Sequence, residues 1–124
     1  MNIAFAYDHL NALCFGNQLR PVTLRLTPWI VNEYDERLAG AWVEADWAIA
    51  IDRALLDHPQ LLFGVLLHEM VHQAVHQAGN PAGHGPFFCA AAARAVAPLG
   101  LPAPTPTTAS TWPVPVAREL LGEM

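Results

Sequence analysis

The sequence contains no lysine, and its six basic residues are arginines scattered along the chain. The 124 residues carry a formal net charge of −5 at pH 7. Without clustered basic side chains, the chain offers no continuous surface for contacts to phosphate groups. The composition therefore disfavours nucleic-acid binding by this chain alone.

Cysteine is also scarce, because only Cys14 and Cys89 are present and they lie far apart in the sequence. Two isolated cysteines make neither a disulfide framework nor a CxxC metal motif. They are expected to be reduced, small, buried side chains.

The sequence shows no feature that directs a chain to a membrane. The first sixteen residues lack the basic start and the uninterrupted apolar run of a signal peptide. The longest apolar stretch is interrupted by His68, Glu69 and His72, so no membrane span is expected. We therefore expect a cytoplasmic protein, a monomer without membrane contact.

Hydrophobic residues make up 53% of the chain, which is enough for one domain with a well-buried core. Apolar residues at helical spacing predict a helix over residues 3–15. Alternating apolar and polar residues predict strands over 21–27, 38–43 and 48–51, with a loop over 31–37. We expect the strands to form a short antiparallel three-stranded sheet.

Two helices are predicted in the second half of the chain. The first covers residues 59–78 and is apolar on nearly every side, which is typical of a core helix. It ends at a glycine–asparagine–proline sequence, a strong stop signal. The second covers residues 86–97 and is rich in alanine, so it can approach the first closely.

Proline-rich sequence begins at Pro98 and changes the character of the chain. We expect one domain over residues 1–97 and a C-terminal tail over residues 98–124, packed on the domain or extending from it. Trp112 is the candidate anchor for such packing, and residues 116–122 are expected to form one helical turn.

An HExxH motif, from His68 to His72, lies inside the expected core helix. Residues four apart lie on one face of a helix, so both imidazoles can reach the same metal ion. Glu69 can then accept a proton from water beside that ion. A chance run of polar residues is a weaker explanation, because a buried helix does not tolerate these side chains without partners.

A catalytic zinc site needs a third protein ligand and an open position for water. Glu119 is a weak candidate because it follows the proline-rich tail. His76 continues the helix face, but positions i, i+4 and i+8 span about 12 Å, so we expect it in the pocket wall. His84 lies after a glycine-containing loop and before the next helix, and it is the better candidate.

The motif from His68 to His72, followed by a loop and the HGxxF sequence from His84 to Phe88, resembles the SprT-like family of zinc metallopeptidases, which includes Spartan. Asn11, with the Phe15-Gly16 pair and Leu19, also looks like the first-helix motif of that family, and residues 49–56 resemble the strand leading to its metal helix. The resemblance covers about residues 7–97.

This resemblance implies that His68, His72 and His84 bind Zn²⁺ and that Glu69 is the general base. The implied fold is a small α+β, zincin-like domain with an N-terminal helix, a short antiparallel sheet, the HExxH helix and a third-ligand helix. Phe88 would pack in the core beneath His84.

The leading functional hypothesis is a zinc metalloendopeptidase that hydrolyses protein or peptide substrates, which would bind along the edge strand 38–43. The alternative is a non-catalytic zinc-binding module in which the tail docks a partner. A structural zinc site with Cys89 as fourth ligand is the third hypothesis. The family resemblance also suggests DNA as a partner, but the acidic charge and the lack of cysteines for a C-terminal zinc ribbon disfavour it.

Overall fold

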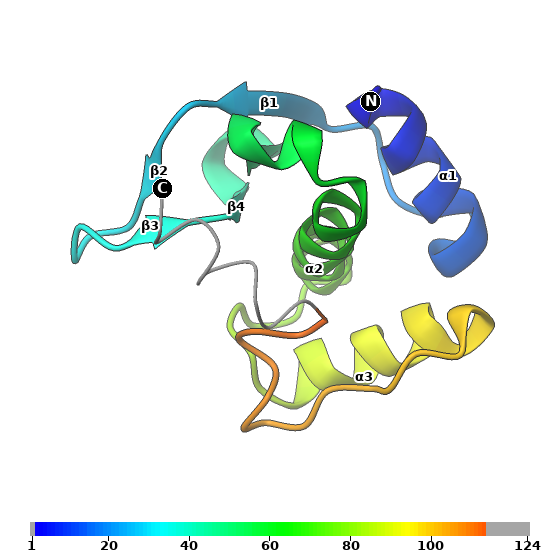
Figure 1. Cartoon of the computed structure of the whole chain (residues 1–124). Coiled ribbons are helices and arrows are strands. Elements are labelled where there is room, and N and C mark those ends of the chain that lie inside the picture. Colours follow the sequence, from blue (N-terminus) through cyan, green and yellow to red (C-terminus); the bar gives the residue numbers. More distant parts are fainter. Residues whose placement is uncertain (1, 114–124) are drawn as a thin grey trace.

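Helix α2 (Pro59–Gln77) lies in the centre of the molecule, and the other elements pack around it (Figure 1). The computed structural model describes residues 2–113. The fold is α+β. In chain order, the remaining helices and strands are α1 (Ile3–Phe15), β1 (Thr23–Thr27), β2 (Ile30–Val31), β3 (Arg37–Leu38), β4 (Gly40–Val43), β5 (Ala48–Asp52) and α3 (Pro86–Val96), with short 3-10 helices η1 (Glu44–Asp46), η2 (Arg53–Asp57) and η3 (Ala97–Leu99).

The main sheet has the strand order β1-β5-β4 and is mixed, so the prediction of a purely antiparallel sheet is wrong. Strand β5 pairs with β4 antiparallel but with β1 parallel, with Leu24 opposite Ile49. All five residues of β5 are buried, as expected for a central strand covered on both faces. The alternation of side chains indicates which face of a strand is buried, but it carries no information on strand direction.

The strand expected over residues 38–43 is divided in two. Its beginning, β3, pairs with β2 in a separate two-stranded sheet, and β4 pairs with β5. The loop predicted over residues 31–37 is therefore the turn of a small hairpin formed by β2 and β3. The Asn32 side-chain oxygen accepts hydrogen bonds from the backbone N–H groups of Tyr34 and Glu36, which fixes this turn.

All three helices form where the sequence predicts them, within one or two residues. The Asn2 side chain caps α1 by accepting from the N–H groups of Ala4 and Phe5. Gly16 ends α1 in the left-handed conformation, with φ of 57°. Among residues 2–113, no helix has both the length and the hydrophobicity needed to cross a membrane.

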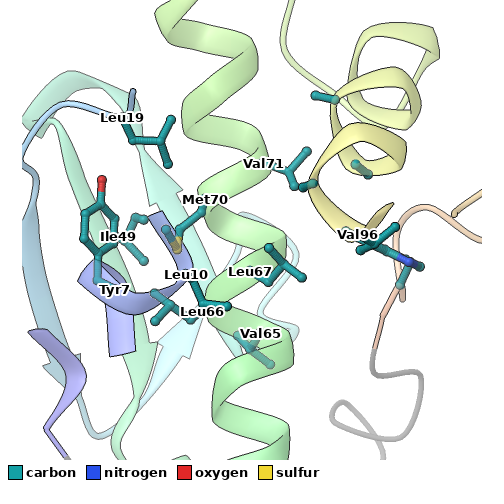
Figure 2. Packing of buried hydrophobic residues seen from close by; sticks show 14 of the residues in the cluster. Tyr7, Leu10, Leu19, Ile49, Val65, Leu66, Leu67, Met70, Val71 and Val96 are labelled. Atoms are coloured by element: carbon teal, nitrogen blue, oxygen red, sulfur yellow. The ribbon is translucent and has the colours of Figure 1, made fainter. Parts of the chain in front are cut away.

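The core lies on two sides of α2 (Figure 2). Leu66 and Met70 point toward Tyr7 and Leu10 of α1 and toward the sheet, whereas Val71 points toward α3. Leu66, Met70 and Val71 are fully buried. Because both sides of α2 are covered by apolar contacts, the position of the HExxH motif is fixed by the core.

The chain after α3 turns back and runs alongside that helix (Figure 1, yellow to orange). Ala109 is fully buried and Trp112 is 7% exposed. The Trp112 indole N–H donates a hydrogen bond of 2.8 Å to the carbonyl of Pro102. This part of the proline-rich tail therefore packs on the helices. The helical turn expected over residues 116–122 lies outside the described residues.

At Gly40, strand β4 approaches α2 closely. A Cβ atom at this position would lie 2.7 Å from Val65 Cγ1 and 3.3 Å from Glu69 Cγ. We expect Gly40→Ala to lower the free energy of unfolding by about 1–3 kcal/mol, because the new methyl group has to displace packed atoms. Urea denaturation measures this change. Gly85→Ala is the matched control, since no atom lies near its Cβ position, and equal stability of the two variants would contradict the packing argument.

Candidate metal centre

Three histidines from two segments converge on one point. His68 and His72 lie one turn apart on α2, with ring centroids 5.0 Å from each other. His84 lies just before α3, and its Nε2 atom is 3.0 Å from Nε2 of His68 and 3.1 Å from Nε2 of His72. The chain returns to α2 at Gly83, whose φ of +111° favours glycine. The structure therefore brings together the three histidines that the sequence predicts as metal ligands.

The three nitrogen atoms fit a metal ion of the size of zinc. One ligand atom from each histidine can be chosen so that all lie within 4.8 Å of one another. Two zinc–nitrogen bonds at a tetrahedral angle place the nitrogens about 3.3 Å apart, close to the observed separations. Without an ion, the Nε2 atoms of three neutral imidazoles face one another with too few protons for each to be hydrogen-bonded. One cation can accept the lone pairs of all three nitrogens.

The protonation pattern of His68 also suits metal binding. Its Nδ1 atom is hydrogen-bonded to the backbone carbonyl of Trp112. Because a carbonyl oxygen only accepts, Nδ1 carries the proton and Nε2 keeps a free lone pair. The lone pair of His68 Nε2 therefore points toward His84 and is available to the ion.

Burial keeps the histidines neutral, which is the form that binds metals. It lowers the pKa of His68 to about 4, although the hydrogen bond to Trp112 acts in the opposite direction. It lowers the pKa of His72 to about 3, and repulsion from His68 and His84 adds to this effect. Burial also lowers the pKa of His84. No proton therefore has to leave these rings at neutral pH before they bind a cation.

Phe88 forms the apolar base of the cluster. It is 1% exposed, and its ring centroid lies 4.7–5.0 Å from the centroids of His68, His72 and His84. The resemblance placed Phe88 beneath His84, and the structure shows it there. A rigid aromatic side chain in contact with all three rings restricts their rotation.

Glu69 lies beside the histidines and is 7% exposed. It lines the same cleft as His68 and His72, a cavity of about 430 Å³. Burial raises the pKa of Glu69 to about 8, and a hydrogen bond from the Trp42 backbone N–H offsets part of this effect. A carboxyl group with a pKa near neutrality, next to a candidate metal position, is suited to proton transfer.

The other candidate ligands lie elsewhere. His76 lies against Glu44, with 2.9 Å between its Nδ1 atom and Oε1 of the carboxylate, and its ring packs against Trp42 and Trp47. The Cys89 thiol lies 3.9 Å from the His84 carbonyl oxygen. Within the described residues, neither belongs to the cluster that could hold an ion. Glu119 lies outside that part of the chain.

Two backbone groups complete the site, and sequence reasoning did not identify either of them. The Trp42 N–H interacts with Glu69, and the Trp112 carbonyl accepts from His68. Backbone groups leave no side-chain signature in a motif. The tryptophan in the proline-rich tail was the one available signal, and it indicated packing rather than a role at the metal.

The buried carboxyl of Glu69 makes the stability of the metal-free protein depend on pH. Because the folded-state pKa exceeds the usual value of 4.5, ionisation costs folding free energy increasingly between pH 4.5 and pH 8. We expect Glu69→Gln to stabilise the metal-free protein by on the order of 3 kcal/mol at pH 7.5 and by little at pH 4. Thermal unfolding in the presence of a chelator measures this.

Glu33→Gln, at an exposed position of the β2–β3 hairpin, is the control and should change stability little at either pH. An equal gain for Glu69→Gln at both pH values would show that the buried charge is not its cause.

Comparison with known proteins is consistent with this geometry. The SprT-like family model matches residues 5–108, a range that contains the sheet, all three histidines and Glu69. Comparisons with curated proteins and with solved structures give no match. Since the family match covers most of the sequence, the chain belongs to the SprT-like family.

Proposed function

We propose that this protein is a zinc-dependent metallopeptidase that hydrolyses peptide bonds in protein or peptide substrates. The observation that carries the proposal is the convergence of three neutral imidazoles beside a buried carboxyl group in an open cleft. Closed structural zinc sites have four protein ligands, most often cysteines. Three histidines with a neighbouring glutamate are typical of catalytic sites instead.

The histidines and the glutamate have different roles in this proposal. His68, His72 and His84 would hold the ion. When bound, zinc supplies Lewis acidity toward water and the peptide carbonyl, and its charge favours the ionised form of Glu69. Glu69 accepts the proton of the attacking water and delivers it to the leaving amine. Glu69 is 7% exposed, and its limited contact with bulk water strengthens these electrostatic interactions.

Strand β4 offers a place for an extended substrate. It is an edge strand, because it pairs with β5 on one side only in the order β1-β5-β4. Residues 38–42 line the cleft beside the histidines. A peptide added to this edge would form main-chain hydrogen bonds to β4 and bring its backbone close to Glu69. Such binding recognises the peptide backbone, which favours a protein or peptide substrate of relaxed sequence.

The electrostatic character of the cleft argues against coupling of this site to DNA. The described residues that line the cleft include the exposed carboxylate of Glu44 and no arginine. Together with the net charge of −5, this surface repels phosphate groups. We therefore propose that proteolysis by this chain does not require DNA.

We expect the purified protein to bind one zinc ion per chain and to cleave casein. Glu69→Gln should keep the zinc and lose activity by about 10²-fold or more, because the proton acceptor is removed while the ligands remain. His84→Ala should lose both zinc and activity. Metal content by mass spectrometry and cleavage with and without single-stranded DNA measure these effects.

His9→Ala is the matched control, because His9 is an exposed histidine on α1. It should keep full zinc content and activity. Zinc binding without Glu69-dependent cleavage would favour the alternative of a non-catalytic zinc-binding module. Absence of zinc after reconstitution would contradict the site itself, and stimulation by DNA would contradict the electrostatic argument.

A further inference from the structure

We propose that residues 101–113 form an integral part of the metal centre, in which Trp112 is a positioning residue for His68. This inference rests on the proposed zinc site and extends it. It assigns a role in ligand geometry to a segment that the composition marks only as a proline-rich tail.

The direct contact is the hydrogen bond from His68 Nδ1–H to the Trp112 carbonyl. Within residues 2–113, His68 is the one cluster histidine with such a backbone acceptor on the ring nitrogen that faces away from the cluster. A partner of this kind fixes the tautomer and the ring orientation of a metal-binding histidine and increases its basicity. His68 is 9% exposed, so water has little access to replace the carbonyl.

The Trp112 side chain holds that carbonyl in place. Its ring packs edge-on against Phe88 at 6.0 Å between centroids and lies 6.4 Å from the His68 ring. Its indole N–H donates to the Pro102 carbonyl at 2.8 Å. Trp112 therefore contacts both the base of the histidine cluster and the start of its own segment, and little rotation of the residue is possible.

The turn before Trp112 is also ordered by local hydrogen bonds. The Thr105 N–H donates to Thr108 Oγ1 at 2.9 Å, and the Trp112 N–H donates to the Thr108 carbonyl at 3.0 Å. Ala109, between these residues, is fully buried. The segment thus has its own internal bonds and an apolar anchor. This explains how a chain rich in proline and threonine presents one carbonyl group at a fixed position.

The same segment shapes the cleft. Ser110, Thr111 and Trp112 line the cavity together with β4 and the His84 loop. The metal centre consequently depends on three parts of the chain. Helix α2 provides two of the proposed ligands and the general base, Glu69. The loop before α3 provides the third ligand, and the C-terminal segment orients His68. A change in this segment should alter metal affinity without touching a ligand.

Trp112→Ala tests this role in the full-length protein. We expect its zinc affinity, measured by competition with a chelator, to fall roughly 10–100-fold. Trp112→Phe, which keeps an aromatic ring on Phe88 and loses the bond to Pro102, should show a smaller loss. Leu24→Ala is the control, since it removes a side chain that packs on the core from β1 and should lower stability without changing zinc affinity.

A second readout does not depend on zinc. Nuclear magnetic resonance of the metal-free protein should show a protected Nδ1–H signal for His68 in the wild type, which is lost in Trp112→Ala and kept in Leu24→Ala. If Trp112→Ala keeps both the His68 Nδ1–H signal and the zinc affinity of the wild type, this inference is overturned and the proposed function still stands. A wild-type protein that binds no zinc would overturn the proposed function, and the signal would still decide whether Trp112 holds His68.

Discussion

The burial of polar side chains on the central helix is the constraint on which the rest of the structure depends. His68 and Glu69, which are buried, and His72, which is half-buried, lie on a helix that packs against both the sheet and α3, where unpaired polar groups are costly. Each one has a specific partner nearby: the Trp112 carbonyl for His68, the Trp42 N–H for Glu69, and the His84 ring for His72. A metal ion would complete this set by satisfying the lone pairs that the imidazoles direct toward each other.

The path of the chain follows from the need to supply these partners. Strand β4 approaches α2 closely because Gly40 has no side chain, and this places the backbone of Trp42 beside Glu69. The loop after α2 reverses at Gly83 and returns His84 to the helix. The segment after α3 runs back along that helix (Figure 1), and its Trp112 carbonyl contacts His68. Strand β4, the loop before α3 and the segment after α3 are separate in the sequence, but all three lie around the face of α2 that carries the HExxH motif.

The helices and the clustering of the three histidines could be predicted from the sequence, because their signals are local. Apolar spacing and stop residues defined α1, α2 and α3, and the spacing of His68, His72 and His84 indicated one metal. The direction of β1 relative to β5 could not be predicted, since it depends on the connection through β2, β3 and β4 rather than on the residues of either strand. The backbone partners at Trp42 and Trp112 could not be predicted either, because they arise from tertiary packing.

The central claim is that three histidines hold one zinc ion and leave a position open for water. X-ray absorption at the zinc edge of the reconstituted protein tests this most directly. We expect three imidazole nitrogens and one further nitrogen or oxygen ligand at about 2.0–2.1 Å, without sulfur. A sulfur ligand at about 2.3 Å, or zinc with no histidine pattern at all, would contradict it. A sulfur ligand would indicate that Cys89 moves to close the site. Zinc bound without histidines would indicate that the convergence of His68, His72 and His84 serves packing alone.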